Sequence, residues 1–111
     1  MPLTIHKFYF KPGPLPQKLT IPGIVTLLHV GEVYDDLYVW AMVDTVMIPF
    51  GSEPVAFYIL GTGYEVTCLE LQPFKFWKTI QMRSGLVWHI FVDKRFPIGY
   101  EGSAEIKTGE N

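Results

Sequence analysis

Residues 75–93 read KFWKTIQMRSGLVWHIFVD, and this stretch decides the fold class. Apolar and polar side chains alternate on both sides of Arg83-Ser84-Gly85, which is the pattern of two β-strands joined by a tight loop. Glycine in the third loop position suits a three-residue hairpin loop whose last residue is left-handed. The stretch therefore predicts a hairpin with strands over Lys75–Met82 and Leu86–Asp93.

The register of this hairpin divides its side chains between two faces, because directly opposite residues lie on the same side of a sheet. The predicted core face holds Phe76, Lys78, Ile80, Met82, Leu86, Trp88, Ile90 and Val92. The opposite, mixed face holds Trp77, Thr79, Gln81, Val87, His89 and Phe91. An accessible aromatic patch is typical of an interface, so we predict a two-fold homodimer through Trp77, Val87 and Phe91. The alternative is a monomer in which a second sheet, with Thr4–Phe10, covers this face.

A second hairpin is predicted upstream. Ile24–Val33 and Leu37–Asp44 flank Asp35-Asp36, and a two-residue turn there would pair Tyr34 with Leu37. Gly31 would then lie opposite Trp40, so that the indole covers the missing side chain. This register predicts a core face made of Leu28, Val30, Val39, Ala41 and Val43. The other face is also apolar and is expected to be covered.

Further strand patterns complete an all-β chain. They cover Thr4–Phe10, Lys18–Ile21, Val55–Leu60 and, as a short irregular strand, Tyr64–Leu71. No sustained helical period with a cap accompanies them. About seven short strands separated by turns predict a small antiparallel β-sandwich or a partly open barrel.

Length and composition limit the domain organisation. A chain of 111 residues with 49% hydrophobic content supports one core, which we assign to residues 1–97. Residues 98–111 are polar and rich in Gly and Glu, so they are predicted to form a flexible tail.

Charge and hydropathy exclude several classes of function. The net charge is −2 and the basic residues are scattered, which argues against binding to duplex nucleic acid. No apolar run reaches the roughly 18 residues that cross a bilayer. Lys7 and Lys11 interrupt the N-terminal apolar segment, so no secretory signal is expected and the protein is assigned to the cytoplasm. The single cysteine, Cys68, is expected to be a buried small hydrophobe.

The stretch FYILGTGYEV, residues 57–66, raises the question of a nucleotide loop. Gly61-Thr62-Gly63 lacks the third glycine and the following helix of a dinucleotide site, and it lacks the Gly-Lys-Ser/Thr of a phosphate loop. The glycines are interpreted first as a corner or bulge at a strand end. The alternative is a loop that contacts a ligand together with Tyr64.

Candidate catalytic and metal-binding residues are few. His6, His29 and His89 each lie in a predicted strand and would bind a metal only if three strands brought them together. The set Cys68, His89 and Asp44 rests on residue type alone. Asp44 and Asp93 close apolar strands, where a carboxylate commonly accepts turn amides. We therefore expect no cofactor, no metal and no catalytic residue.

Aromatic residues are the most unusual feature. They are too many for the inward face of a single sheet, so either a second sheet or a partner covers them. The residues in question are Phe8, Phe10, Tyr38, Trp40, Trp77 and Phe91.

The order of several motifs resembles a known family. The start IHKF, the strand LYVWAMVD, the segment FYILGTGYEV and the strand LVWHIFV are similar to segments of small uncharacterised proteins encoded by bacteriophages and prophages. The resemblance covers residues 5–92 and implies a phage or mobile-element origin. That family has no assigned activity, so the resemblance transfers no functional residue.

These observations predict a non-catalytic binding protein that inhibits or modulates a host or phage protein through direct contact, in the manner of anti-defence proteins. The alternative is a protein that sequesters a nucleotide or another small molecule at the glycine loop. The candidate binding residues are Trp40, Gly61, Thr62, Gly63, Tyr64, Trp77, His89 and Phe91.

Overall fold

The computed structural model describes residues 2–13 and 15–99, and most of these residues lie in β-strands. The strands are β1 (Leu3–Phe10), β2 (Gln17–Pro22), β3 (Ile24–Val33), β4 (Asp36–Asp44), β5 (Ser52–Gly61), β6 (Phe74–Gln81) and β7 (Val87–Asp93). A 3₁₀ turn, η1 (Ile48–Phe50), and a one-turn helix, α1 (Cys68–Leu71), interrupt them. The all-β prediction is confirmed.

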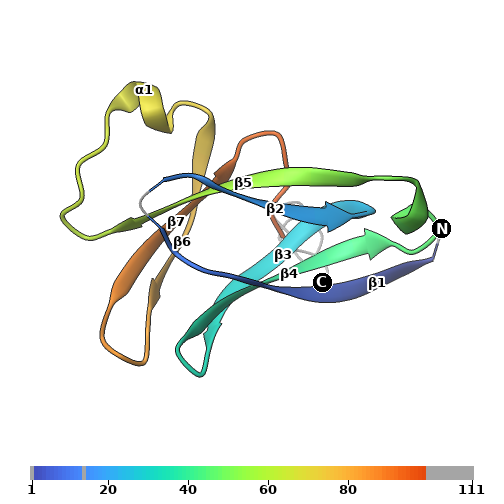
Figure 1. Cartoon of the computed structure of the whole chain (residues 1–111), viewed down its shortest axis with the longest axis horizontal. Helices are drawn as coiled ribbons and strands as arrows, with labels where there is room; N and C mark the ends of the chain where they lie inside the picture. Colours follow the sequence, from blue (N-terminus) through green and yellow to red (C-terminus); the bar gives the residue numbers. More distant parts are fainter. Residues whose placement is uncertain (1, 14, 100–111) are drawn as a thin grey trace, which may run out of the picture.

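The strands form two open antiparallel sheets packed face to face (Figure 1). One sheet has the order β1-β4-β3 and the other β2-β5-β7-β6. The inner faces of both sheets supply the core, whose fully buried side chains include Ile21, Leu27, Val39, Phe57 and Ile90. The fold is thus an open two-sheet structure and not a closed barrel. In the described part of the chain, no helix has the length and apolar character needed to cross a membrane.

The chain passes from one sheet to the other at Gly23, between the end of β2 and the start of β3. Gly23 has φ +64°, and a Cβ atom there would lie 2.6 Å from the carbonyl oxygen of Asp44. The Gly23 carbonyl in turn accepts a hydrogen bond of 2.8 Å from the Asp44 amide. Only glycine meets both the positive φ and this close approach without strain.

The β3-β4 hairpin is confirmed, but its predicted register is wrong by two residues. The turn residues are Tyr34 and Asp35, with φ 51° and 68°, and Val33 pairs with Asp36. Two consecutive positive φ angles define a turn whose twist matches the strands, which is why the loop closes one residue earlier than predicted. The Asp35 amide also donates to the Glu32 carboxylate at 2.7 Å.

A two-residue shift preserves the faces of a strand, so the predicted core face is nearly correct. Gly31 pairs with Tyr38, and Trp40 pairs with His29 instead of Gly31. The indole still reaches the space beside Gly31, with Cζ3 3.7 Å from the position of a Cβ atom. A register shift between Leu27 and His29 brings Leu27, and not Leu28, into the core.

The β6-β7 hairpin has the predicted loop, with Gly85 at φ +99° and the Met82 amide bonded to the Leu86 carbonyl at 2.7 Å. A β-bulge between Phe76 and Lys78 changes which side chains of β6 point toward the core. It turns Trp77 inward, where the indole stacks on Phe57 at 6.4 Å, and leaves Phe76 55% exposed. The predicted positions of Phe76 and Trp77 are therefore wrong, because the bulge inserts one extra residue into the strand.

The predicted irregular strand over Tyr64–Leu71 is also wrong. Thr67 caps α1 in a reciprocal capping box, in which its hydroxyl accepts from the Glu70 amide and the Glu70 carboxylate accepts from the Thr67 amide. The Thr-x-x-Glu spacing is the signal that predicts this cap. Cys68 lies on α1 and is exposed, so its predicted burial is incorrect.

The domain extends slightly beyond its predicted end at residue 97. Ile98 is 8% exposed and bridges in parallel to Leu27, whose amide donates to the Pro97 carbonyl at 3.1 Å. Ile98 therefore belongs to the core and not to a tail. The remainder of the predicted tail, residues 100–111, lies outside the described residues.

The tips of the two hairpins hold the sheets together at one end. Asp35 accepts a hydrogen bond of 2.9 Å from the Ser84 amide. The Arg83 guanidinium lies 3.6 Å from the Glu32 carboxylate and 5.3 Å from the Tyr34 ring centroid. Lys78 of β6 also links the two sheets, because its Nζ donates to the Val30 carbonyl of β3 at 3.3 Å.

Candidate functional site

Six of the eight candidate binding residues lie together at one corner of the four-stranded sheet. They border a hollow of about 340 Å³, which we name the corner hollow. Its lining comprises Leu60, Gly61, Thr62, Gly63, Tyr64, Val66, Leu71, Phe76, His89 and Phe91. The sequence therefore located this cluster, although it missed the contributions of Leu60, Val66, Leu71 and Phe76.

The glycine segment forms the rim of the corner hollow as a turn at the end of β5. The Tyr64 amide donates to the Gly61 carbonyl at 3.1 Å, and Gly63 has φ +93°. A Cβ atom on Gly61 would lie 3.3 Å from Tyr64 Cε1 and 3.4 Å from Trp88 Cζ3. The structural interpretation of Gly61-Thr62-Gly63 as a corner is confirmed.

His89 borders the corner hollow, and both of its ring nitrogens are engaged. Its Nε2 is 2.8 Å from the Thr62 hydroxyl, and its Nδ1 is 3.0 Å from the Thr79 hydroxyl. These contacts fix the plane of the imidazole. Among the described residues that line the hollow, none is Lys or Arg. The lining thus suits a planar or aliphatic group better than a phosphate, which is usually bound by cations or helix N-termini.

The other two candidates lie elsewhere. Trp77 faces the core, so it cannot contribute to the mixed face on which the predicted dimer depends. Trp40 lies on the outer side of the three-stranded sheet, which we name the open face. Alternation along β1, β4 and β3 assigns to this face Leu3, Ile5, Lys7, Tyr9, His29, Val33, Tyr38, Trp40 and Met42.

Aromatic rings form a continuous row across the three strands of the open face. The ring centroids of Tyr9 and Tyr38 are 5.6 Å apart, those of Tyr38 and Trp40 6.3 Å, and those of Trp40 and His29 5.3 Å. Lys7 Nζ lies 4.7 Å from the Tyr38 centroid, a distance typical of a cation–π contact. Partial burial, and secondarily the charge of Lys78, lowers the pKa of His29.

The open face remains accessible in the described structure. Leu3, Ile5 and Tyr9 on β1 are 46%, 53% and 50% exposed. The sequence indicated an apolar second face and a surplus of aromatic residues, but it did not single out Leu3, Ile5 or Tyr9. The sequence signal that these three residues share is alternation, which places them on one face of the first strand.

The surplus aromatic residues divide between the core and the surface. Phe10 stacks on Phe57 of the other sheet at 5.1 Å, and Phe8 and Trp77 pack against the same core. Tyr38 and Trp40 lie on the open face. The alternative of a second sheet therefore holds for Phe8, Phe10 and Trp77, whereas Tyr38 and Trp40 lie on an outer face.

The ionisable candidates have structural partners. Asp44 accepts from the Val46 amide at 2.9 Å, and Asp93 accepts from the Arg95 amide at 3.0 Å, which confirms both turn predictions. The Arg95 guanidinium also donates to both carboxylate oxygens of Asp93 and lowers the pKa of that carboxyl group. Within residues 2–13 and 15–99, no group of three or more His, Cys, Asp or Glu side chains could hold a metal ion.

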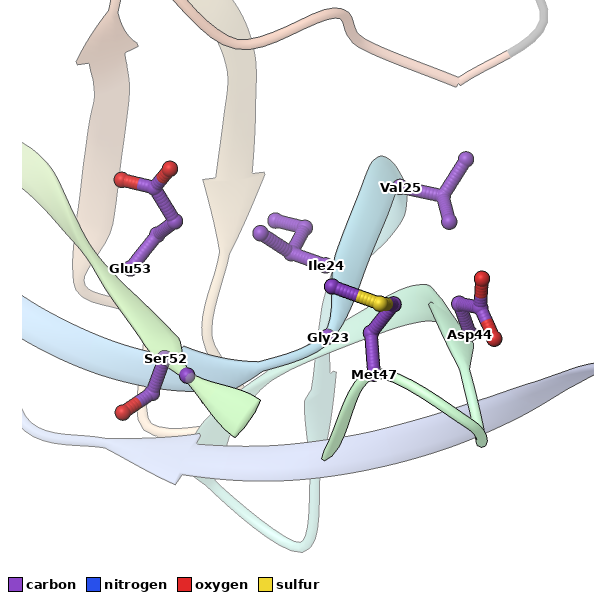
Figure 2. A pocket seen from close by; sticks show the side chains of 8 residues that line it. Gly23, Ile24, Val25, Asp44, Met47, Ser52 and Glu53 are labelled. Carbon is purple, nitrogen blue, oxygen red and sulfur yellow. The ribbon is translucent and has the colours of Figure 1, made fainter. Parts of the chain in front are cut away.

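A further hollow lies at the opposite end of the molecule, near the Gly23 corner. It has a volume of about 320 Å³ and is bordered by backbone of Gly23 and Gly51 and by several side chains. Figure 2 shows Asp44 and Glu53 at opposite sides of this hollow, with Ile24 and Met47 between them. The two carboxylates do not converge on one point.

Fold and surface together define a small open β-sandwich whose inner faces form its core and whose three-stranded sheet has an accessible outer face. Within that class, the chain belongs to the family described as "Domain of unknown function (DUF7352)", whose model matches residues 1–98. The match ends at Ile98, the last buried residue of the described chain. No curated protein and no solved structure matches the chain.

Proposed function

We propose that this chain is a non-catalytic binding protein and that it binds another protein through the open face. The observation that supports this proposal most strongly is the exposure of Leu3, Ile5 and Tyr9 beside the aromatic row of Tyr38 and Trp40. Contiguous apolar surface of this kind marks an interaction site in soluble proteins. Such binding requires a complementary surface and no activated group.

The chemistry of the open face indicates the kind of partner. Tyr and Trp are enriched at the energetic centres of protein interfaces, and the open face holds Tyr9, Tyr38 and Trp40 in one row. Lys7 lies among them with its ammonium group over Tyr38. The expected partner therefore presents an apolar patch with a carboxylate positioned opposite Lys7.

The biological setting of the proposal rests on the resemblance of several sequence motifs to those of phage and prophage proteins. Small genes of that origin often act on host systems, so we propose a partner protein in the host cytoplasm. Covering a surface of the partner would inhibit or modulate its activity, as anti-defence proteins do. The family assignment is compatible with this role and assigns no activity of its own.

The experiment is a quantitative capture from bacterial cells that express the tagged chain. Tyr9→Glu places a charge in the aromatic row of the open face without touching the core, because Tyr9 is 50% exposed. Phe50→Glu is the matched control, since Phe50 is 75% exposed and lies in η1, outside the three strands that form the open face. A partner in one-to-one amount should be retained by Phe50→Glu and lost by Tyr9→Glu. Equal retention by both variants would contradict the proposal.

A second candidate function is supported by the corner hollow. Its volume of about 340 Å³ falls at the lower end of small-ligand pockets, and Tyr64, Phe76 and Phe91 offer aromatic surface. A nucleobase or a similar planar molecule would stack there, with any phosphate directed to solvent. Native mass spectrometry of the purified protein would reveal a bound small molecule that denaturation releases, and Phe91→Ala should reduce its occupancy.

A further inference from the structure

The edge strands of the two sheets differ in how well they are protected from pairing with another chain. The edges are β1 and β3 in one sheet and β2 and β6 in the other. β2 ends at Pro22, and β6 carries the bulge at Trp77. β3 has two register shifts, and the bridge to Ile98 occupies part of its outer edge. Proline, bulges and covering segments are common devices that block edge-to-edge association.

In the described part of the chain, β1 has no proline, no bulge and no covering segment, and the charged side chain of Lys7 is its one protecting device. Its eight residues pair with β4 without a register shift, and no proline lies within Leu3–Phe10. Within residues 2–13 and 15–99, β1 pairs with β4 alone and is an edge strand of its sheet. One row of its backbone amide and carbonyl groups is therefore available to another strand.

We propose that β1 pairs antiparallel with β1 of a second copy, around a two-fold axis at His6. Self-pairing of an edge is the simplest closed association, because one patch serves both copies. The product is a continuous six-stranded sheet with the order β3-β4-β1-β1-β4-β3. The open faces of the two copies then join into one surface about twice as wide.

Charge and alternation select the register. If the two-fold axis passed between two residues of β1, outward side chains of one copy would pair with inward side chains of the other. The axis therefore passes through a residue, which we call the centre. A centre at Lys7 would set two ammonium groups directly opposite each other, which is destabilising. A centre at Ile5 would shorten the overlap to Leu3–Lys7. A centre at His6 pairs Leu3 with Tyr9 and Ile5 with Lys7, all on the outer side, and avoids facing like charges of lysine.

This interface differs from the dimer expected on the mixed face of β6 and β7, and it does not depend on the proposed partner. It uses backbone hydrogen bonds and the side chains of one strand, whereas partner binding uses the whole open face. The mass of the purified chain therefore tests the β1 dimer without any knowledge of the partner.

The test is sedimentation equilibrium of the purified full chain at about 5–200 µM, with two variants of opposite charge at one exposed position. The chain should sediment at twice its mass of 12.7 kDa in the upper part of this range. Ile5→Glu places a carboxylate opposite Lys7 of the second copy at two symmetric points, whereas Ile5→Lys places an ammonium group there. The dissociation constant should be at least about tenfold higher for Ile5→Lys than for Ile5→Glu.

The control is the same pair of substitutions at Val25, which is 39% exposed and lies on β3, at the other edge of the sheet. Val25→Glu and Val25→Lys should dimerise equally. A monomer at the highest concentration would overturn the proposal. A dimer whose affinity is the same for Ile5→Glu and Ile5→Lys would also overturn it, because the strands would then not meet in this register.

Discussion

Substitution of Gly23 by alanine tests how the chain crosses between the two sheets. The left-handed conformation at φ +64° costs a residue with a Cβ atom about 1–2 kcal/mol. The new methyl group would lie 2.6 Å from the Asp44 carbonyl oxygen and 3.2 Å from Ile48 Cγ1. Backbone must therefore move, which costs about 1–3 kcal/mol. Weakening of the Asp44–Gly23 hydrogen bond adds about 1 kcal/mol.

Together these effects amount to about 4 kcal/mol, a large share of the roughly 5–15 kcal/mol that stabilises a domain. Two other glycines serve as graded controls. Gly63 has φ +93° but open space around it, so Gly63→Ala should cost about 1–2 kcal/mol from backbone strain alone. Gly51 is extended at φ 166° with nothing within 4 Å, so Gly51→Ala should be neutral or stabilising by about 0.5 kcal/mol.

Urea unfolding followed by tryptophan fluorescence gives the free energy of unfolding for each variant, since the chain has 3 tryptophans. The expected order of stability is Gly51→Ala, then Gly63→Ala, then Gly23→Ala. If Gly23→Ala unfolds at the same urea concentration as Gly51→Ala, the close approach at the corner does not exist and the topology of the crossing is wrong.

Two further stability predictions follow from the β6-β7 hairpin and the segment after it. Because the bulge turns Trp77 toward Phe57 and leaves Phe76 55% exposed, Trp77→Ala should cost about 3 kcal/mol and Phe76→Ala about 1 kcal/mol in urea unfolding, and the reverse order would refute the bulge. Arg95→Gln should lower the melting temperature by on the order of 5 °C at neutral pH, because Asp93 is 9% exposed and loses its guanidinium partner. The hydrogen bonds from Arg95 lower the folded-state pKa of Asp93, so their stabilisation is complete above the ordinary pKa of aspartate and is lost as the pH falls through the folded value. The difference between Arg95→Gln and the parent protein should therefore shrink as the pH is lowered below the ordinary pKa of aspartate, and a difference independent of pH would contradict this origin.

Alternation and turn chemistry were sufficient to predict most of the fold from the sequence. Arg83-Ser84-Gly85 specified both the loop type and the pairing of Met82 with Leu86. Bulges are the main features that alternation cannot reveal. One bulge turns Trp77 inward in place of Phe76. A register shift next to Leu28 turns Leu27 inward in place of Leu28. Such shifts depend on which side chains fit against the opposite sheet, and that information is not local.

The candidate site was only partly accessible to sequence reasoning. The glycine corner and His89 were found because glycine and histidine stand out by residue type. The open face was missed as a unit, since its residues come from three strands whose order in the sheet, β1-β4-β3, differs from their order in the chain. In the sequence, Leu3, Ile5 and Tyr9 do not differ from other strand residues, because only the order of the sheet shows that β1 lies at an edge.

Site-specific photocross-linking in living bacterial cells tests the central claim, that the open face binds another protein, most directly. The photoreactive residue p-benzoylphenylalanine would replace Tyr9 on the open face in one variant and Phe50 in η1 in the other; both positions are exposed. The account predicts a cross-linked product from position 9 that contains one other protein, and no such product from position 50. A product that contains two copies of this chain would reflect the dimer alone. The central claim is contradicted if position 9 gives no product with another protein, or if position 50 gives the same one.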